Sequence, residues 1–244
     1  MINPKNKWRR YNTPLGICIN EKCETVISKY LIPNYQGQIQ LIFTSPPFPL
    51  NRAKKYGNLM GDEYKKWLCD VVKSMLPLLT EDGSIVIEIG NAWNYGEPTF
   101  STLPMETLLS IKNECGLSLC QEFIYYNPAR LPSPIQYVNI DRIRVKDSFT
   151  RVWWFSRSAN PKANNRNVLK QYSKQMKKLL ETGQYNAGER PSEHSISETA
   201  FNNDNGGAIP SNVIIASNTN SRDPYLLRCK ENGIKIHPAR MPFE

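Results

Sequence analysis

Apolar and β-branched residues gather in four short stretches that predict strands, at residues 38–44, 84–90, 117–126 and 152–155. The runs at 38–44 and 84–90 are almost continuously apolar, with little alternation between apolar and polar positions. Continuous apolar character is typical of parallel strands that are covered on both faces. These stretches therefore predict a buried sheet at the centre of the protein.

Between these strands, apolar residues recur at helical spacing. The clearest pattern spans residues 62–79, with Asp62 expected as its N-cap, and a second pattern spans residues 104–115 and stops before Gly116. A shorter helix is predicted over residues 24–31. The alternation of strands and helices predicts an α/β fold, with a parallel sheet and helices on its faces.

The pattern changes after residue 156. Over residues 157–233 the content of Ser, Asn, Gly and Lys rises and the periodicity fades, except for one basic helix predicted near 166–181. We therefore expect an α/β core over residues 1–156, a smaller and variable lobe over 157–233, and a closing segment over 234–244.

The composition indicates a globular protein. Hydrophobic residues make up 40% of the chain, which is enough to bury a core. No apolar run reaches the roughly 18 residues of a membrane span, and the basic start of the chain lacks the apolar stretch of a signal peptide. The six cysteines are scattered and form no CxxC pair, and the chain has only two histidines. We therefore expect free thiols in the cytoplasm, without a disulfide framework or a metal site.

The net charge of +9 is concentrated in one part of the chain. Residues 142–180 contain eleven Lys or Arg and a single acid, Asp147. Such a cluster favours a polyanionic partner, with nucleic acid first, although a solvated helix face would give the same pattern. Arg142, Arg144 and Lys146 alternate with apolar residues, so they are expected to share one strand face. That face suits phosphate contact, and it equally suits plain exposure to solvent.

The strand at 38–44 leads into Ser45-Pro46-Pro47-Phe48. Proline lacks an N–H and has a fixed φ, so the two prolines are expected to end the strand and stiffen the turn. In open α/β sheets, ligands bind at the carboxyl ends of strands. This turn is therefore the first place to expect chemistry, and the alternative is a proline-rich turn without any.

Two segments carry a resemblance to a known family. Residues Thr44-Ser45-Pro46-Pro47-Phe48 and the segment His237–Pro242 resemble the catalytic and cofactor-side motifs of the amino-group DNA methyltransferases, which use S-adenosylmethionine. Further similarity to a methylase of a restriction–modification system lies at Tyr56–Leu59, Leu131–Ile135, Arg142–Asp147, Val152–Ser156 and Asp204–Gly207. The resemblance covers nearly the whole chain in one order.

The resemblance implies a Rossmann-like class I methyltransferase sheet, with a catalytic core followed by a basic DNA target-recognition lobe and the start of a cofactor-binding segment. Double-stranded DNA is the implied partner and S-adenosylmethionine the implied cofactor, with a palindromic target like CAGCTG. Serine at the head of the catalytic turn favours N4 of cytosine, and N6 of adenine is the alternative. The implied site residues are Ser45, Pro46, Pro47 and Phe48 for catalysis, Tyr11, Thr44, His237 and Pro238 for the cofactor, and Arg52, Lys54, Lys55, Arg142, Arg144, Lys146 and Asn205 for DNA.

The chemistry of a cytosine amine explains these residue types. Its lone pair is delocalised into the ring, and the base has to leave the duplex before an enzyme can reach it. Ser45 Oγ and the Pro46 carbonyl would accept hydrogen bonds from the two amine hydrogens, in a turn that the prolines hold fixed. Phe48 would stack on the extruded base, which is worth about 1–3 kcal/mol by analogy with single-strand binding proteins.

Two features depart from the family pattern. The glycine-rich cofactor motif that the family places after the His237–Pro242 segment is not found, and the Gly-Asp pair near the family's start is replaced around Asn20-Glu21. We therefore expect the C-terminal cofactor-binding strands to be missing and the strand at 38–44 to have an apolar, unpaired edge. The alternatives to a self-sufficient enzyme are a truncated DNA-binding fragment that is inactive alone, and one half of a split enzyme whose second polypeptide supplies the motif.

Overall fold

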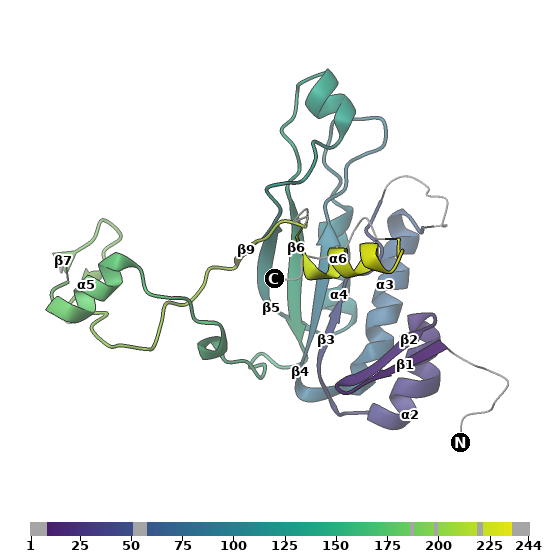
Figure 1. The fold of residues 1–244 in the computed structure, drawn as a ribbon, viewed down its shortest axis with the longest axis horizontal. Coiled ribbons are helices and arrows are strands. Elements are labelled where there is room, and N and C mark those ends of the chain that lie inside the picture. Colours follow the sequence, from purple (N-terminus) through teal and green to yellow (C-terminus); the bar gives the residue numbers. More distant parts are fainter. Residues whose placement is uncertain (1–8, 51–57, 186–187, 198–199, 219–221, 236–244) are drawn as a thin grey trace. The chain divides into compact units, whose positions relative to one another are not determined.

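A computed structural model describes residues 9–50, 58–185, 188–197, 200–218 and 222–235 (Figure 1). Two compact units make up the chain. The larger unit comprises Met1–Lys162 with Val213–Glu244, and the smaller unit comprises Ala163–Asn212.

A five-stranded sheet in the order β3-β4-β6-β5-β9 forms the centre of the larger unit. Strand β3 runs parallel to β4, β6 runs antiparallel to both β4 and β5, and β9 runs parallel to β5. The strands are β3 (Ile39–Thr44), β4 (Leu79–Gly90), β5 (Ser118–Tyr126), β6 (Phe149–Ser156) and β9 (Val213–Ile215). The four predicted strands are confirmed, and β4 begins five residues earlier than its apolar run, at Leu79 and not residue 84.

The prediction of a wholly parallel sheet is wrong. The connection between β5 and β6 contains only the short π-helix η3 (Gln136–Ile140). A parallel return requires a crossover connection, usually a long helix packed on the sheet, and this segment has none. The chain instead returns as the antiparallel strand β6, which lies between β4 and β5. The sheet is therefore mixed, and the α/β class is still correct.

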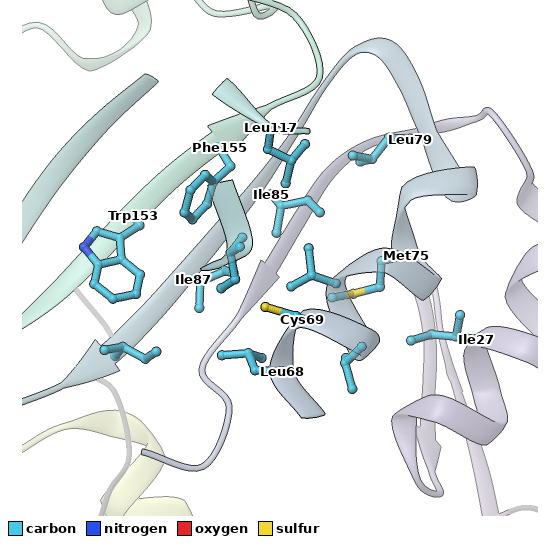
Figure 2. Close-up of a cluster of buried hydrophobic side chains, with 14 of the residues drawn as sticks. Ile27, Leu68, Cys69, Met75, Leu79, Ile85, Ile87, Leu117, Trp153 and Phe155 are labelled. Atoms are coloured by element: carbon cyan, nitrogen blue, oxygen red, sulfur yellow. The ribbon is translucent and has the colours of Figure 1, made fainter. Parts of the chain in front are cut away.

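The main core lies between this sheet and two helices, α3 (Gly61–Met75) and α4 (Leu103–Glu114). Ile85, Ile87 and Ile89 of β4 are fully buried and pack in one cluster with Trp153 and Phe155 of β6 (Figure 2). The 3₁₀ turn η2 (Leu76–Leu78) links α3 to β4. Both predicted helices are confirmed, but the N-cap of α3 is Met60, while Asp62 lies in the first turn and pairs with Lys65 at 2.7 Å.

The N-terminal part is a hairpin followed by a run of short helical turns. Trp67 of α3 donates a hydrogen bond from Nε1 to Glu24 at 2.9 Å, which fastens the first of these turns to the core helix. The elements are β1 (Arg9–Thr13), β2 (Gly16–Asn20), α1 (Cys23–Val26), η1 (Ile27–Leu31) and α2 (Ile32–Tyr35). The helix predicted over 24–31 is therefore part of a longer helical stretch.

The last described element of the larger unit is α6 (Pro224–Glu231). Its N-cap Asp223 is buried and accepts the Tyr225 N–H at 2.8 Å, and proline occupies the first helical position. None of the helices in the described ranges is both long and apolar enough to cross a membrane.

The smaller unit has short elements joined by loops. They are η4 (Asn165–Val168), α5 (Lys174–Thr182), β7 (Gly188–Glu189) and β8 (Ser195–Ile196). The basic helix predicted near 166–181 is interrupted, because Lys170 pairs its backbone with Ala208 and Ser173 caps a new helix by accepting the Met176 N–H at 3.2 Å. This unit lies within the stretch 157–233 whose composition sets it apart.

Candidate active site

The turn after β3 is seated on the neighbouring strand. Thr44 is the last residue of β3 and lies opposite Ile87 of β4, so the chain leaves the sheet beside the end of β4. The Phe48 ring lies directly against Gly90, and a Cβ added at Gly90 would overlap ring atoms Cδ2 and Cε2. Only glycine at this position leaves room for the ring.

Helix α3 holds the same turn from its other side. The Tyr64 hydroxyl donates a 2.7 Å hydrogen bond to the carbonyl oxygen of Pro47. Burial raises the pKa of Tyr64, so the hydroxyl stays protonated and remains a donor. Ser45 stays exposed at the head of the turn. The turn therefore has a fixed backbone and an accessible hydroxyl.

Asn91 follows the glycine that seats Phe48, and it is buried. Its Nδ2 donates to the carbonyl of Phe149 at 3.4 Å, while no described residue makes a hydrogen bond with its Oδ1. A buried acceptor without a partner costs free energy comparable to that of a lost hydrogen bond. This atom is therefore a feature of the site that calls for a partner.

A cavity of about 520 Å³ is lined in part by Leu50, two residues after the turn. Its walls come from the loop after β4 and from the connection between β5 and β6. The lining residues are Leu50, Ala92, Trp93, Tyr95, Gly96, Ser133, Pro134, Ile135, Gln136 and Tyr137. The lining is mostly apolar and aromatic, with an amide and hydroxyl groups and no charged side chain, which suits a flat and uncharged ligand.

The structure brings the four predicted catalytic residues together in one turn. The predicted cofactor residues are spread out: Thr44 ends β3, and Tyr11 is an exposed residue of β1 that pairs with Cys18. Five predicted residues lie outside the described ranges, namely Arg52, Lys54, Lys55, His237 and Pro238. The roles assigned to all of these residues stay predictions.

The predicted strand face of Arg142, Arg144 and Lys146 is wrong. These residues lie in an irregular segment after η3, and Arg142 has a φ of 55°, which no strand residue adopts. The apolar residues between them, Ile143 and Val145, are 62% and 87% exposed. A period of two predicts a strand only where a partner strand pairs with it, and none pairs here.

Two of these three basic residues are held by their own connection. Arg144 pairs with Asp147 at 3.5 Å, and Lys146 donates to the carbonyl oxygens of Pro128 and Arg130 at 3.2 and 3.1 Å. Their charges therefore help to fold the loop that borders the cavity. Contact of these residues with DNA stays a prediction.

Helix α5 carries three of the exposed positive charges of the smaller unit. Lys174, Lys177 and Lys178 are all exposed, and they take part in none of the ion pairs found among the described residues. Asn205, another predicted DNA contact, also belongs to this unit and is exposed. The described ranges contain no group of three or more His, Cys, Asp or Glu side chains placed to bind a metal.

Sequence reasoning identified the turn but missed its supports. The sequence alone places Tyr64 in a helix, Gly90 at a strand end and Asn91 in a loop. It does not show their contacts with the turn or its surroundings, because these contacts join residues that lie far apart in the chain. Gly90 alone left a signal, since a glycine that ends a buried strand often marks a close approach of another group.

Known proteins resemble this chain in both sequence and fold. The family model described as DNA methylase (N6_N4_Mtase) matches residues 39–244. The Type II methyltransferase M.PvuII of Proteus hauseri is 45% identical over 206 residues, covering 84% of this chain and 61% of the relative. The solved PvuII DNA methyltransferase (cytosine-N4-specific) matches with a TM-score of 0.64 at 36% identity, covering 88% of this chain and 64% of that chain. The chain thus spans less than two thirds of the length of these relatives.

These matches confirm the resemblance predicted from the motifs, including the closer one to the methylase of the PvuII system. They also confirm the α/β methyltransferase fold. The family model begins at the first residue of β3 and includes the turn Ser45–Phe48, the cavity walls and the smaller unit. The chain belongs to the DNA methylase family.

Proposed function

We propose that this chain is the part of a site-specific DNA methyltransferase that binds the target DNA and holds the base that accepts the methyl group. The reaction is transfer of a methyl group from S-adenosylmethionine to the N4 amine of a cytosine flipped out of duplex DNA, in a restriction–modification system. The observation that carries the proposal is the turn Ser45–Phe48, which is fixed by Gly90 and Tyr64 and keeps the Ser45 hydroxyl accessible.

The turn offers two acceptors to the amine. Tyr64 already donates to the Pro47 carbonyl, so we assign the Ser45 hydroxyl and the Pro46 carbonyl to the two amine hydrogens. Accepting both hydrogens favours a pyramidal nitrogen whose lone pair is free to attack. Because Tyr64 and Gly90 hold the turn before substrate arrives, little reorganisation is needed in the transition state.

We assign the 520 Å³ cavity to the flipped base. A base taken out of the stack loses stacking and pairing, and aromatic walls recover part of that loss. Trp93, Tyr95 and Tyr137 supply such walls, and Gln136 supplies an amide that can bind the pyrimidine edge.

The described residues do not form a complete site for S-adenosylmethionine. That cofactor carries a carboxylate, an ammonium group and ribose hydroxyls, and the cavity lining has no charged side chain to bind them. We therefore assign Thr44, Tyr11, His237 and Pro238 to the cofactor side, and we propose that further polypeptide completes this set.

A second candidate function follows from the outer edge of the sheet. Strand β3 is the terminal strand of the sheet formed by the described residues, and its Leu41 and Phe43 side chains are 57% and 54% exposed. Exposed apolar edges are normally covered. The chain would then be a DNA-binding part whose cofactor site is completed by a segment along β3, either of the same protein or of a second polypeptide.

Calorimetric titration of the chain with S-adenosylmethionine tests whether the cofactor site has to be completed by further polypeptide. We expect weak binding or none from the chain alone, and binding once the completing polypeptide is added. Micromolar binding by the chain alone would show that its own residues suffice.

The acceptor is tested by nucleoside mass spectrometry of DNA from a methylation-free host that expresses the complete enzyme. We expect N4-methylcytosine. N6-methyladenine would assign the turn to the adenine-specific branch instead, and the absence of any methylated base would leave the chain as a DNA-binding protein.

A further inference from the structure

One phenol hydroxyl holds the turn Asp204–Gly207 of the smaller unit in a single shape. The Tyr172 hydroxyl donates to Asp204 Oδ1 at 3.0 Å and accepts the backbone N–H of Asn205 at 2.8 Å. The same carboxylate oxygen accepts the N–H of Gly206 at 2.8 Å. Tyr172 therefore acts as donor and acceptor at once, and both contacts lie within the turn.

The base of this turn is fastened to the segment that carries Tyr172. Lys170 and Ala208 exchange two backbone hydrogen bonds of 2.9 Å each. Gly207 is buried against them, since a Cβ added there would lie 2.7 Å from the Lys170 carbonyl oxygen. With its base paired and its tip bonded to Tyr172, the turn has little freedom to change shape.

The turn presents Asn205 to a cavity of about 430 Å³. Asn205 Nδ2 donates to the carbonyl of Asn203 at 3.2 Å, which fixes the orientation of the amide and leaves its oxygen and one N–H for a ligand. The lining residues are Asn165, Arg166, Leu169, Tyr172, Met176, Asn205, Gly207, Ala208 and Ile209. Asn and Arg are the side chains that bind adenine and guanine edges bidentately in the major groove.

We propose that Asn205 binds the major-groove edge of an adenine in the target site, and that Tyr172 is the positioning residue that sets this base preference. The inference rests on the proposed function and deepens it. A bidentate amide–adenine pair requires the amide plane to be fixed before contact, because an amide that is free to rotate meets every base edge equally well. Tyr172 helps to fix the amide plane of Asn205 before contact, because it holds the backbone of that residue.

The test begins with selection of the preferred duplex from a randomised pool by the whole chain. Dissociation constants are then measured, at one salt concentration, for that duplex and for duplexes in which each base pair is replaced in turn. We expect replacement of one A·T pair to weaken binding about tenfold or more. In Tyr172→Phe and in Asn205→Ala, the same replacement should weaken binding less than about threefold, with affinity for unrelated DNA within about twofold of the unsubstituted chain.

Two further variants separate positioning from folding. Asp204→Asn keeps an oxygen that can accept from Tyr172 and from Gly206, so it should retain the base preference. Tyr185→Phe removes a phenol hydroxyl from the same unit away from the turn, where the Tyr185 ring packs on Phe201 at 5.0 Å, and it should change nothing.

Each outcome has one meaning. Retention of the A·T preference by Tyr172→Phe would overturn the inference and leave the proposed function intact. Equal loss of affinity for all duplexes would overturn it too, because it would reveal a general folding defect. Binding by the unsubstituted chain without any base preference would overturn the site-specific part of the proposed function together with the inference.

Discussion

The two turns of this protein that carry its proposed chemistry are fixed by different means. The turn Ser45–Phe48 rests on the main core, with an aromatic ring against Gly90 and a buried phenol as donor. The turn Asp204–Gly207 belongs to a unit of short elements and depends on hydrogen bonds that lie near solvent. The proposed site for chemistry is thus held by packing, while the proposed site for base recognition is held by polar contacts.

This difference is physically sensible. Packing in a close-packed core tolerates almost no displacement, and methyl transfer needs atoms aligned within a fraction of an ångström. Solvated hydrogen bonds are worth only about 0.5–1.5 kcal/mol each, so the loss of one of them loosens the recognition turn without unfolding the rest of the protein. The comparison predicts large effects from changes under the first turn and local effects from changes under the second.

The largest effect is expected from Gly90→Ala. The added methyl would displace the Phe48 ring, and overpacking of this kind costs about 1–3 kcal/mol in the free energy of unfolding. Urea denaturation measures that cost, and methyl transfer by the complete enzyme should fall with it. Gly16→Ala is the control, because a Cβ there meets nothing within 4 Å, and a loss equal to that of Gly90→Ala would contradict the packing argument.

A smaller effect is expected from Tyr64→Phe. The change removes the hydrogen bond to the Pro47 carbonyl and leaves the buried ring in place, so the free energy of unfolding should drop by about 1 kcal/mol. Tyr95→Phe removes a hydroxyl from a largely exposed ring and should leave stability unchanged. If the unsubstituted protein, Tyr64→Phe and Tyr95→Phe all unfold at the same urea concentration, Tyr64 does not support the turn.

Gly207→Ala should act only locally. Its Cβ would press on the Lys170 carbonyl and open the pairing between Lys170 and Ala208. Hydrogen exchange should show faster exchange of these two backbone amides, while exchange in β4 and β6 stays unchanged. Protection lost in both units together would show that the two turns are not independent.

The smallest effect concerns the exposed charges that we expect to contact DNA. Replacing Lys174, Lys177 and Lys178 by Ala should flatten the dependence of log K on log salt by about 0.9 for each DNA phosphate that is no longer neutralised. Lys146→Ala should flatten that slope less than the triple replacement does, because its ammonium group already binds two carbonyl oxygens of its own loop. A flatter slope in Lys146→Ala alone would reverse this assignment.

The sequence predicted the first region better than the second. Strands β3, β4 and β6 and helices α3 and α4 follow from apolar periodicity, because burial on one or both faces imposes that period. The mixed direction of the sheet was missed, although the lack of a helical pattern between β5 and β6 was a signal against a parallel crossover.

Contacts between distant residues were also beyond prediction. Nothing in the local pattern joins Tyr64 to Pro47 or Tyr172 to Asn205, because hydrogen bonds of this kind leave no periodic trace. The alternation at Arg142–Lys146 was misleading for a related reason. Lys146 donates to the backbone of an irregular loop and Arg144 pairs with the Asp147 carboxylate, which spacing alone could not reveal.

The central claim is that the Ser45 hydroxyl binds the amine that receives the methyl group. The most direct test compares single-turnover methyl transfer by the complete enzyme and its Ser45→Ala variant, with DNA affinity measured in parallel. Loss of a preorganised hydrogen-bonding group should slow transfer about 10²–10³-fold, with the dissociation constant for DNA within about twofold. Unchanged turnover in Ser45→Ala would contradict the account.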